Sequence, residues 1–224
     1  MRKAAVLAVV ALIAVSCGSR VGASPPPSAT TTSPAVSASG SASASPSGPG
    51  RSLSAAEAQR LVGARVAATL DALKKRDGVA LAALAHPTKG VRFSPYPFVA
   101  TARNVVLMRA DLTNAYADPK TRTWGVTDGK GDPITLTFSD YSATYVYSRD
   151  FLAASKTSYN KPIGSGNSID NTADVYPNAV LFEAYDPGPD PAMESFRWQS
   201  LRLLFEPDGS TWYLVGVVHG EWTI

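Results

Sequence analysis

The segment 196–222 constrains the fold of this chain more than any other stretch. Two runs rich in aromatic and β-branched residues, 196–206 and 211–222, flank the turn sequence Pro207-Asp208-Gly209-Ser210. Aspartate and glycine tolerate the backbone angles of a tight turn, so this pattern predicts a β-hairpin with two long strands. These strands hold much of the apolar bulk of the second half of the chain. We therefore expect a two-layer core against one face of the hairpin.

Side chains alternate along a strand, which divides the second run of the hairpin into two faces. The face without an ionisable group is the expected core face, and it has Trp212, Leu214, Gly216, Val218 and Trp222. The opposite face has Tyr213, Val215, Val217, His219 and Glu221. We expect this second face to border a cavity under the 86–96 loop. The alternative is a solvated face on which His219 only pairs with Glu221.

Two helices are predicted at the start of the folded region. Ser54-Ala55-Ala56-Glu57 matches a capping box, and apolar residues recur at helical spacing after it, which predicts a helix over 55–75. Asp77 is the expected N-cap of a shorter helix that ends before Pro87.

Shorter elements are expected between the two helices and the hairpin. Apolar and β-branched runs predict strands at 105–107, 134–137 and 179–185, with a helical turn at 110–117. Ser139 is the expected N-cap of a further helix that continues to Tyr147. Residues 155–178 show no clean periodicity. The fold class is therefore α+β: an N-terminal helical pair packed on a twisted, mostly antiparallel sheet that ends in the long C-terminal hairpin. We expect one globular domain over 51–224.

The first fifty residues have the composition of an export signal followed by a tether. A basic start, Met1-Arg2-Lys3, precedes an apolar run over 4–15 that is too short to span a bilayer as a mature helix, so 1–16 is an expected signal peptide. Residues 18–50 are almost exclusively Ser, Ala, Pro, Gly and Thr, which bury too little apolar surface to order a chain. We expect 17–50 to be a disordered tether with a span of roughly 30 Å.

Cys17 is the only cysteine of the chain, and it ends the export signal. The sequence Ala14-Val15-Ser16-Cys17 resembles the lipobox of bacterial lipoproteins, in which the cysteine is lipidated and becomes the first residue. The resemblance implies a protein anchored to the cell membrane by lipid on Cys17, on the extracytoplasmic face. The alternative is an ordinary secretory signal that is cut nearby, with Cys17 incidental. With Cys17 used as an anchor, no disulfide can form within the domain, so packing must stabilise it.

The charge of the chain argues against a nucleic-acid partner. Three of the 21 basic residues, Arg2, Lys3 and Arg20, lie in the first fifty residues, which contain no acid. The remaining 18 basic residues are therefore balanced by 18 acidic ones over 51–224. Charges of the two signs are interspersed, so the basic surface that binds nucleic acid is not expected.

Two further stretches resemble known families. The junction Leu73-Lys74-Lys75-Arg76-Asp77, followed by Leu81-Ala82-Ala83-Leu84, is similar to the first two helices of nuclear-transport-factor-like (cystatin-like) α+β proteins, as is the terminal hairpin over 214–222. The pairing of 86–96 with 218–224 resembles a group of bacterial surface lipoproteins. The first resemblance implies a fold over 51–224 and the second a surface location, and neither implies an activity.

The candidate site residues lie in the 86–96 loop and in the last strand. His86 and His219 are the only histidines and titrate near neutrality, so they are the acid/base candidates, with Tyr96, Asp140 or Glu183 as expected neighbours. The alternative is that His86 binds a backbone carbonyl and His219 is solvated. No ligand spacing typical of zinc is present, so we expect no metal and no cofactor. Catalytic residues are not assigned.

Aromatic residues favour a binding function. Tryptophan and tyrosine suit concave ligand sites, although they also fill the layer between helices and sheet. The expected ligand pocket contains His86, Tyr96, Tyr213, His219 and Glu221. We therefore expect a membrane-tethered, non-enzymatic domain that binds a small molecule or an envelope protein. The alternative functions are a hydrolase or isomerase that uses a histidine and a carboxylate, and a purely structural envelope protein.

Overall fold

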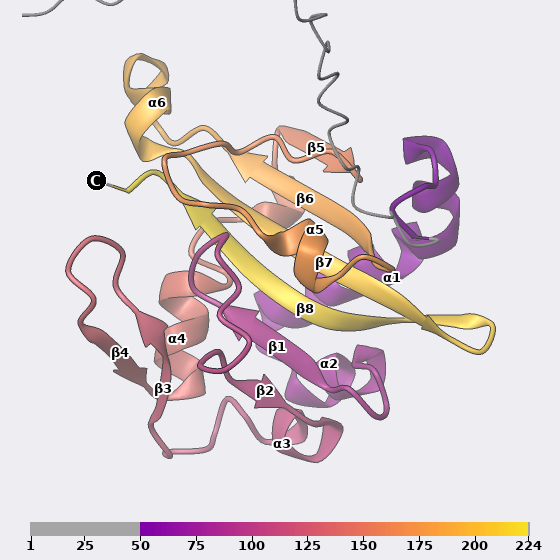
Figure 1. The fold of residues 1–224 in the computed structure, drawn as a ribbon. Helices are drawn as coiled ribbons and strands as arrows, with labels where there is room; N and C mark the ends of the chain where they lie inside the picture. The colour runs from indigo at the N-terminus through magenta and orange to yellow at the C-terminus, as the bar shows by residue number, and fades with distance from the viewer. Residues whose placement is uncertain (1–49, 224) are drawn as a thin grey trace, which may run out of the picture. The chain divides into compact units, whose positions relative to one another are not determined.

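A computed structural model describes residues 50–223, and Figure 1 shows its α+β fold. This part of the chain contains six α-helices, a mixed six-stranded sheet and a separate two-stranded sheet. The predicted signal peptide, the lipidation at Cys17 and residues 17–49 of the predicted tether lie outside the described residues, whereas Gly50, the last residue of that tether, is described. Gly50 is buried, and its carbonyl accepts a hydrogen bond from Asn160 Nδ2 at 2.8 Å, so the folded part begins at or before this residue.

The main sheet has the strand order β2-β1-β8-β7-β6-β5. Its strands are β1 (Val91–Ser94), β2 (Val106–Leu107), β5 (Lys156–Tyr159), β6 (Val180–Asp186), β7 (Gln199–Asp208) and β8 (Thr211–Glu221). The β1–β8 pair is parallel and the other pairs are antiparallel. The separate hairpin consists of β3 (Arg122–Val126) and β4 (Pro133–Leu136). Strand β5 falls in the stretch without periodicity. This strand lies at the edge of the sheet and contains no aliphatic residue, so its sequence lacks the apolar pattern that predicts a strand.

The predicted C-terminal hairpin is present as β7 and β8, and its turn is tight. Asp208 pairs with Thr211, and Gly209 between them has a φ of 59°, which glycine adopts without strain. The predicted start of the first strand is wrong, because residues 196 and 197 belong to the short helix α6 (Glu194–Arg197). Strand β7 begins only at Gln199.

A β-bulge in β8 changes which face of the sheet the side chains on either side of it point to. Leu204 pairs with Gly216 and Phe205 with Leu214, which leaves Val215 as an extra residue. Leu214 and Val217 therefore share one core, whereas Val215 and Val218 belong to another. The predicted division into two strictly alternating faces is wrong, because that alternation holds only for a strand without a bulge.

The two predicted N-terminal helices are confirmed as α1 (Ala55–Lys75) and α2 (Gly78–Leu84). The Ser54 and Glu57 side chains form both halves of the capping box. The Asp77 side chain accepts the backbone N–H of Ala80 at 2.9 Å, as predicted for an N-cap.

The other helices are short. They are α3 (Arg109–Thr113), α4 (Phe138–Tyr145) and α5 (Thr172–Val175), with two 3₁₀ turns at Phe151–Ala153 and Pro191–Met193. Thr137, rather than the predicted Ser139, caps α4: its Oγ1 accepts the backbone N–H of Asp140. This change begins α4 at Phe138, which is fully buried.

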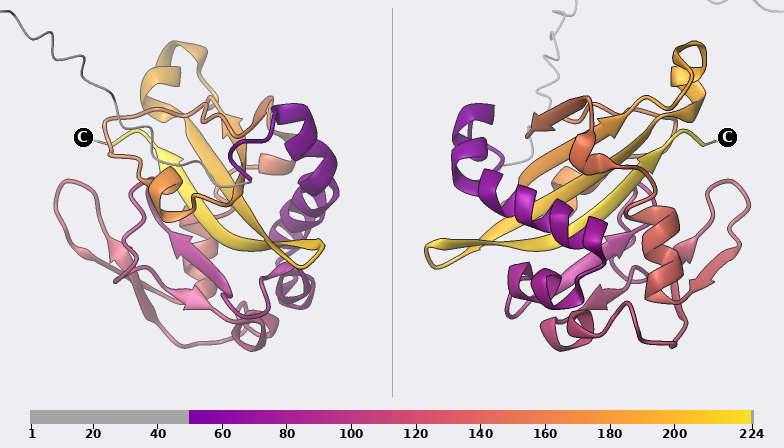
Figure 2. Two further views of the ribbon diagram at one scale, coloured as in Figure 1. Left: turned by 45° about the vertical axis from the view of Figure 1, so that its right-hand side comes forward. Right: turned by 180° about the vertical axis from the view of Figure 1, so that it is seen from behind.

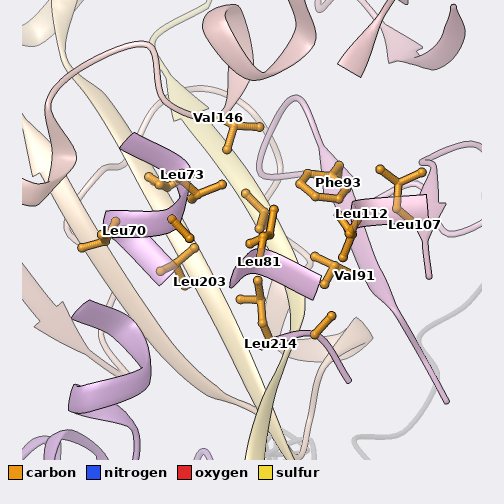
Figure 3. Close-up of a cluster of buried hydrophobic side chains, with 14 of the residues drawn as sticks. Leu70, Leu73, Leu81, Val91, Phe93, Leu107, Leu112, Val146, Leu203 and Leu214 are labelled. Carbon is orange, nitrogen blue, oxygen red and sulfur yellow. The ribbon is translucent and has the colours of Figure 1, made fainter. Parts of the chain in front are cut away.

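The main core lies between one face of the sheet and the helices α1, α2 and α4. Figure 2, seen from behind, shows α1 crossing this face. In Figure 3, side chains from α1 and α2 meet those of the strands, with Leu73 near Leu203 and Leu81 near Leu214. All four side chains are 1% exposed or less. This contact explains why the first two helices form a layer on the hairpin.

The opposite face of the sheet is also covered, which corrects the expectation that only one face would be packed. The chain segment with α5 passes in front of it in Figure 1. A second core there includes Tyr176, Leu181, Leu204 and Val218. Beside this core, Glu183 and Arg202 face each other across β6 and β7, both buried.

Candidate functional site

A cleft of about 480 Å³ lies where three segments distant in sequence meet: the loop after β1, the β3–β4 hairpin and the loop before α5. Its walls are more apolar than polar, a composition that ligand pockets share. The residues that line it are Pro95, Tyr96, Phe98, Ala100, Arg103, Asn104, Gly125, Val126, Thr127, Asp128, Asn167, Ser168 and Ile169. Phe98 and Ile169 are 51% and 73% exposed, which is unusual for residues so apolar.

Hydrogen bonds from buried side chains shape the loop on the first side of the cleft. Ser94 Oγ donates to the carbonyl of Tyr96 at 2.8 Å. Asn104 Oδ1 accepts the Ala100 N–H at 2.6 Å, and its Nδ2 donates to the carbonyl of Trp124 at 3.0 Å. Because Trp124 lies in β3, Asn104 holds the loop against the two-stranded sheet.

Asp128 fastens the other side of the cleft. Its Oδ2 accepts hydrogen bonds from Ser168 Oγ at 2.6 Å and from Thr223 Oγ1 at 2.5 Å. These two hydroxyls lower the pKa of Asp128 below its ordinary value. Asp128 and Asp132 lie in the turn of the β3–β4 hairpin. The Asp128 carboxylate thereby connects that turn to the loop before α5 and to the C-terminal segment.

Three of the five predicted pocket residues gather near this cleft, around Tyr145 of α4. Tyr96 lines the cleft, and its ring lies 6.0 Å from that of Tyr145. The His219 ring also lies 6.0 Å from the Tyr145 ring, in an edge-to-face arrangement. The Nε2 atom of His219 is 3.6 Å from Glu221 Oε2. Burial and the neighbouring Tyr145 raise the pKa of Tyr96, so its hydroxyl stays protonated.

His219 is fully buried and does not line the cleft. Among residues 50–223 neither of its ring nitrogens has a hydrogen-bond partner. Burial alone raises the pKa of Glu221, but the contact with His219 and the amide of Gln199 outweigh it and lower that pKa. Glu221 lines a separate hollow of about 170 Å³ with Trp198, Gln199 and Trp222.

The other two predicted residues, His86 and Tyr213, contact each other at the far end of β8. Their rings are 5.9 Å apart, edge to face. Tyr213 and His219 are six positions apart in the sequence, which is roughly 20 Å along a strand. The structure therefore divides the five residues between the two ends of β8.

His86 and Tyr213 have structural contacts. His86 Nδ1 accepts the backbone N–H of Thr88 and of Lys89, at 3.3 and 3.2 Å. This finding corrects the alternative in which His86 binds a carbonyl. The guanidinium groups of Arg65 and Arg109 lie over the Tyr213 ring, at 4.8 and 5.1 Å from its centroid, and donate to the last carbonyls of α2.

Comparison with other proteins adds no identification. The chain matches no protein-family model, no curated protein and no solved structure.

Within residues 50–223, no helix has the length and apolar content needed to cross a membrane. In the same part of the chain, no group of three or more His, Cys, Asp or Glu side chains is arranged to hold a metal ion.

The geometry favours binding of an organic molecule in the cleft through apolar contact and a few polar groups. Sequence reasoning identified Tyr96 but missed most of the lining, notably Phe98, Arg103 and Ile169. These residues belong to loops without a motif. The one available signal is the presence of large apolar residues between prolines and glycines, where exposure is expected.

Proposed function

We propose that this protein is an extracytoplasmic lipoprotein, anchored in the cell membrane through Cys17, whose globular domain binds a small molecule without catalysing a reaction. The sequence of the export signal supports the anchor, and the cleft between the loop after β1, the β3–β4 hairpin and the loop before α5 supports the binding function. A tether over 17–50 lets the domain meet ligands away from the bilayer.

The observation that carries the proposal is the exposure of Phe98 and Ile169 in the cleft walls. Both side chains have an apolar surface that the described part of the protein does not cover. Hydrogen bonds of Asn104 and Asp128 hold the surrounding loops in place, so the cleft is already formed. A preformed site costs less to occupy, because few side chains must be ordered on binding. Contact with an organic ligand would remove this apolar surface from water.

A thermal-shift screen of small organic molecules tests the proposal, with Ala100→Trp as the variant that fills the cleft. Ala100 lines the cleft, whereas the exposed Ala102 nearby does not, so Ala102→Trp is the matched control. Ligands of the cleft should raise the melting temperature of the wild type and of Ala102→Trp, but not that of Ala100→Trp. Molecules that stabilise all three proteins equally would place binding elsewhere and contradict the proposal.

The alternative function is a hydrolase or isomerase that uses His219 and Glu221. The observation in its favour is the 3.6 Å separation between His219 Nε2 and the carboxylate of Glu221. Because His219 is fully buried, this function requires an opening movement that exposes the ring. Turnover of a model ester by the wild type, lost in His219→Gln, would favour the alternative.

The contacts of α1 and α2 with the sheet support a relationship to nuclear-transport-factor-like α+β proteins. In this proposal the long hairpin β7–β8 is the twisted end of a mostly antiparallel sheet, and the helical pair packs on its inner face. The parallel β1–β8 pair and the added β3–β4 hairpin are the features of this chain that depart from an antiparallel plan.

A further inference from the structure

The polar side chains that line the cleft differ in whether they already form hydrogen bonds within the protein. Asp128 is the only acidic residue of its lining, and both of its carboxylate oxygens are occupied. Oδ1 accepts the Gly129 N–H at 3.1 Å, and Oδ2 accepts the hydroxyls of Ser168 and Thr223. A cationic ligand would have to displace these donors, so the cleft is not prepared for a cation.

Other polar groups of the lining are likewise engaged within the protein. Asn104 uses both its carbonyl oxygen and its amide nitrogen to hold the loop. Thr127 Oγ1 accepts the Asp132 N–H at 3.0 Å. Their hydrogen-bonding capacity is directed toward the protein, and they add little charge to the cleft.

Arg103 is the exception. It lines the cleft and is exposed, and its guanidinium has no hydrogen bond or ion pair with any side chain or backbone group of residues 50–223. A guanidinium is a cation that offers a planar fork of donors, which fits a carboxylate, sulfonate or phosphate. The cleft therefore combines apolar walls with one cation that no group of the described residues 50–223 neutralises.

We infer that the ligand of this cleft is a small organic anion with an apolar body. Its body lies against Tyr96, Phe98 and Ile169, and its anionic group pairs with Arg103. An exposed ion pair is weak, so apolar contact supplies most of the affinity and Arg103 selects for the negative charge. This inference rests on the proposed binding function and names the class of molecule that the site accepts.

Two fluorescent dyes of similar shape test the inference. 8-Anilino-1-naphthalenesulfonate has an apolar body with a sulfonate, and N-phenyl-1-naphthylamine has the same aromatic body without charge. The protein is the whole chain after the expected signal peptide, with Cys17→Ser so that neither lipid nor detergent competes for the dyes. Titrations compare wild type with Arg103→Gln and with Arg60→Gln, an exposed arginine of α1 that does not line the cleft.

The expected result is selective. Arg103→Gln should weaken binding of the sulfonate by roughly three- to fivefold, while the neutral dye keeps its affinity within about 1.5-fold. Arg60→Gln should bind both dyes as the wild type does, and Ala100→Trp should bind neither.

Two results would overturn the inference in different ways. Equal affinities of Arg103→Gln and wild type for the sulfonate would remove the role of Arg103, although the cleft itself would stand. Dyes that bind Ala100→Trp as well as wild type, or fail to bind wild type, would remove the cleft as a site and the proposed function with it.

Discussion

Arg202 Nε donates a hydrogen bond to Glu183 Oε1 at 3.2 Å, and both side chains are buried within the sheet. The same guanidinium donates to Asp170 at 2.6 Å and to the carbonyl of Gly164 at 2.8 Å. Glu183 also accepts the backbone N–H groups of Ile163 and Gly164. One charge pair therefore fastens the irregular segment before α5 to the face of the sheet that carries the second core.

Arg202→Met should lower the free energy of unfolding by about 3–5 kcal/mol, because it leaves the Glu183 carboxylate buried without its cation. Urea unfolding followed by circular dichroism measures this loss. The double variant Glu183→Leu/Arg202→Met should recover part of it, since an apolar pair needs no counter-ion, although the N–H groups of Ile163 and Gly164 then lose their acceptor.

Lys156→Met is the matched control for this experiment. It breaks an exposed ion pair between Lys156 of β5 and Glu194 of α6, and it should leave the urea midpoint unchanged within error. An Arg202→Met protein that unfolds at the wild-type urea concentration would show that the buried pair does not stabilise the fold.

His219 should be structural rather than functional. His219→Ala removes a fully buried ring beside Tyr145 and should cost about 2–4 kcal/mol through the cavity that it leaves. His219→Phe should cost less, because its ring fills most of the same space, although it gives up the 3.6 Å contact between Nε2 and Glu221. Both losses are read from urea unfolding. Dye binding that disappears in a folded His219→Phe protein would instead give His219 a direct part in the site.

His86 should make stability depend on pH. Burial and the nearby Lys89 lower the pKa of His86 below its ordinary 6.5, so the folded state favours the neutral ring whose Nδ1 accepts two backbone N–H groups. The unfolded chain binds the proton more readily. The stabilising contribution is therefore complete above pH 6.5 and is lost as the pH falls from 6.5 toward the pKa of the folded state.

The measurement compares wild type with His86→Gln in urea at several pH values between about 8 and 5. The stability difference between the two proteins should shrink as the pH falls, and the effects of groups that both proteins share cancel in this difference. A difference that stays constant over this range would mean that His86 does not titrate differently in the folded and unfolded states.

Membrane anchoring should depend on one atom, the Cys17 sulfur. Wild-type protein expressed in a bacterium with a lipoprotein pathway should partition into the detergent phase, and Cys17→Ser should stay in the aqueous phase. Conversion of Ser16 to Ala keeps a small residue before the cysteine and serves as the control. A Cys17→Ser protein that still partitions with the membrane would exclude lipidation as the anchor.

The prediction of individual elements succeeded where the signal is local. The capping box of Ser54 and Glu57, the N-cap at Asp77 and the tight turn at Gly209 each depend on a few neighbouring residues, and the structure has all three. Strand β5 escaped prediction because its residues are not apolar and its order comes from pairing with β6. Pairing partners are not encoded in the composition of a short stretch.

The sequence alone determined the two N-terminal helices, the C-terminal hairpin and their order in this protein, since propensity, capping and turn chemistry act over a few residues. The tertiary structure decided the bulge at Val215, because the register of β7 against β8 reflects all contacts along both strands. The cleft likewise depends on the tertiary structure. Residues 95–104, 125–128 and 167–169 meet only after the sheet has formed, so of the five residues expected in a pocket only Tyr96 lines it.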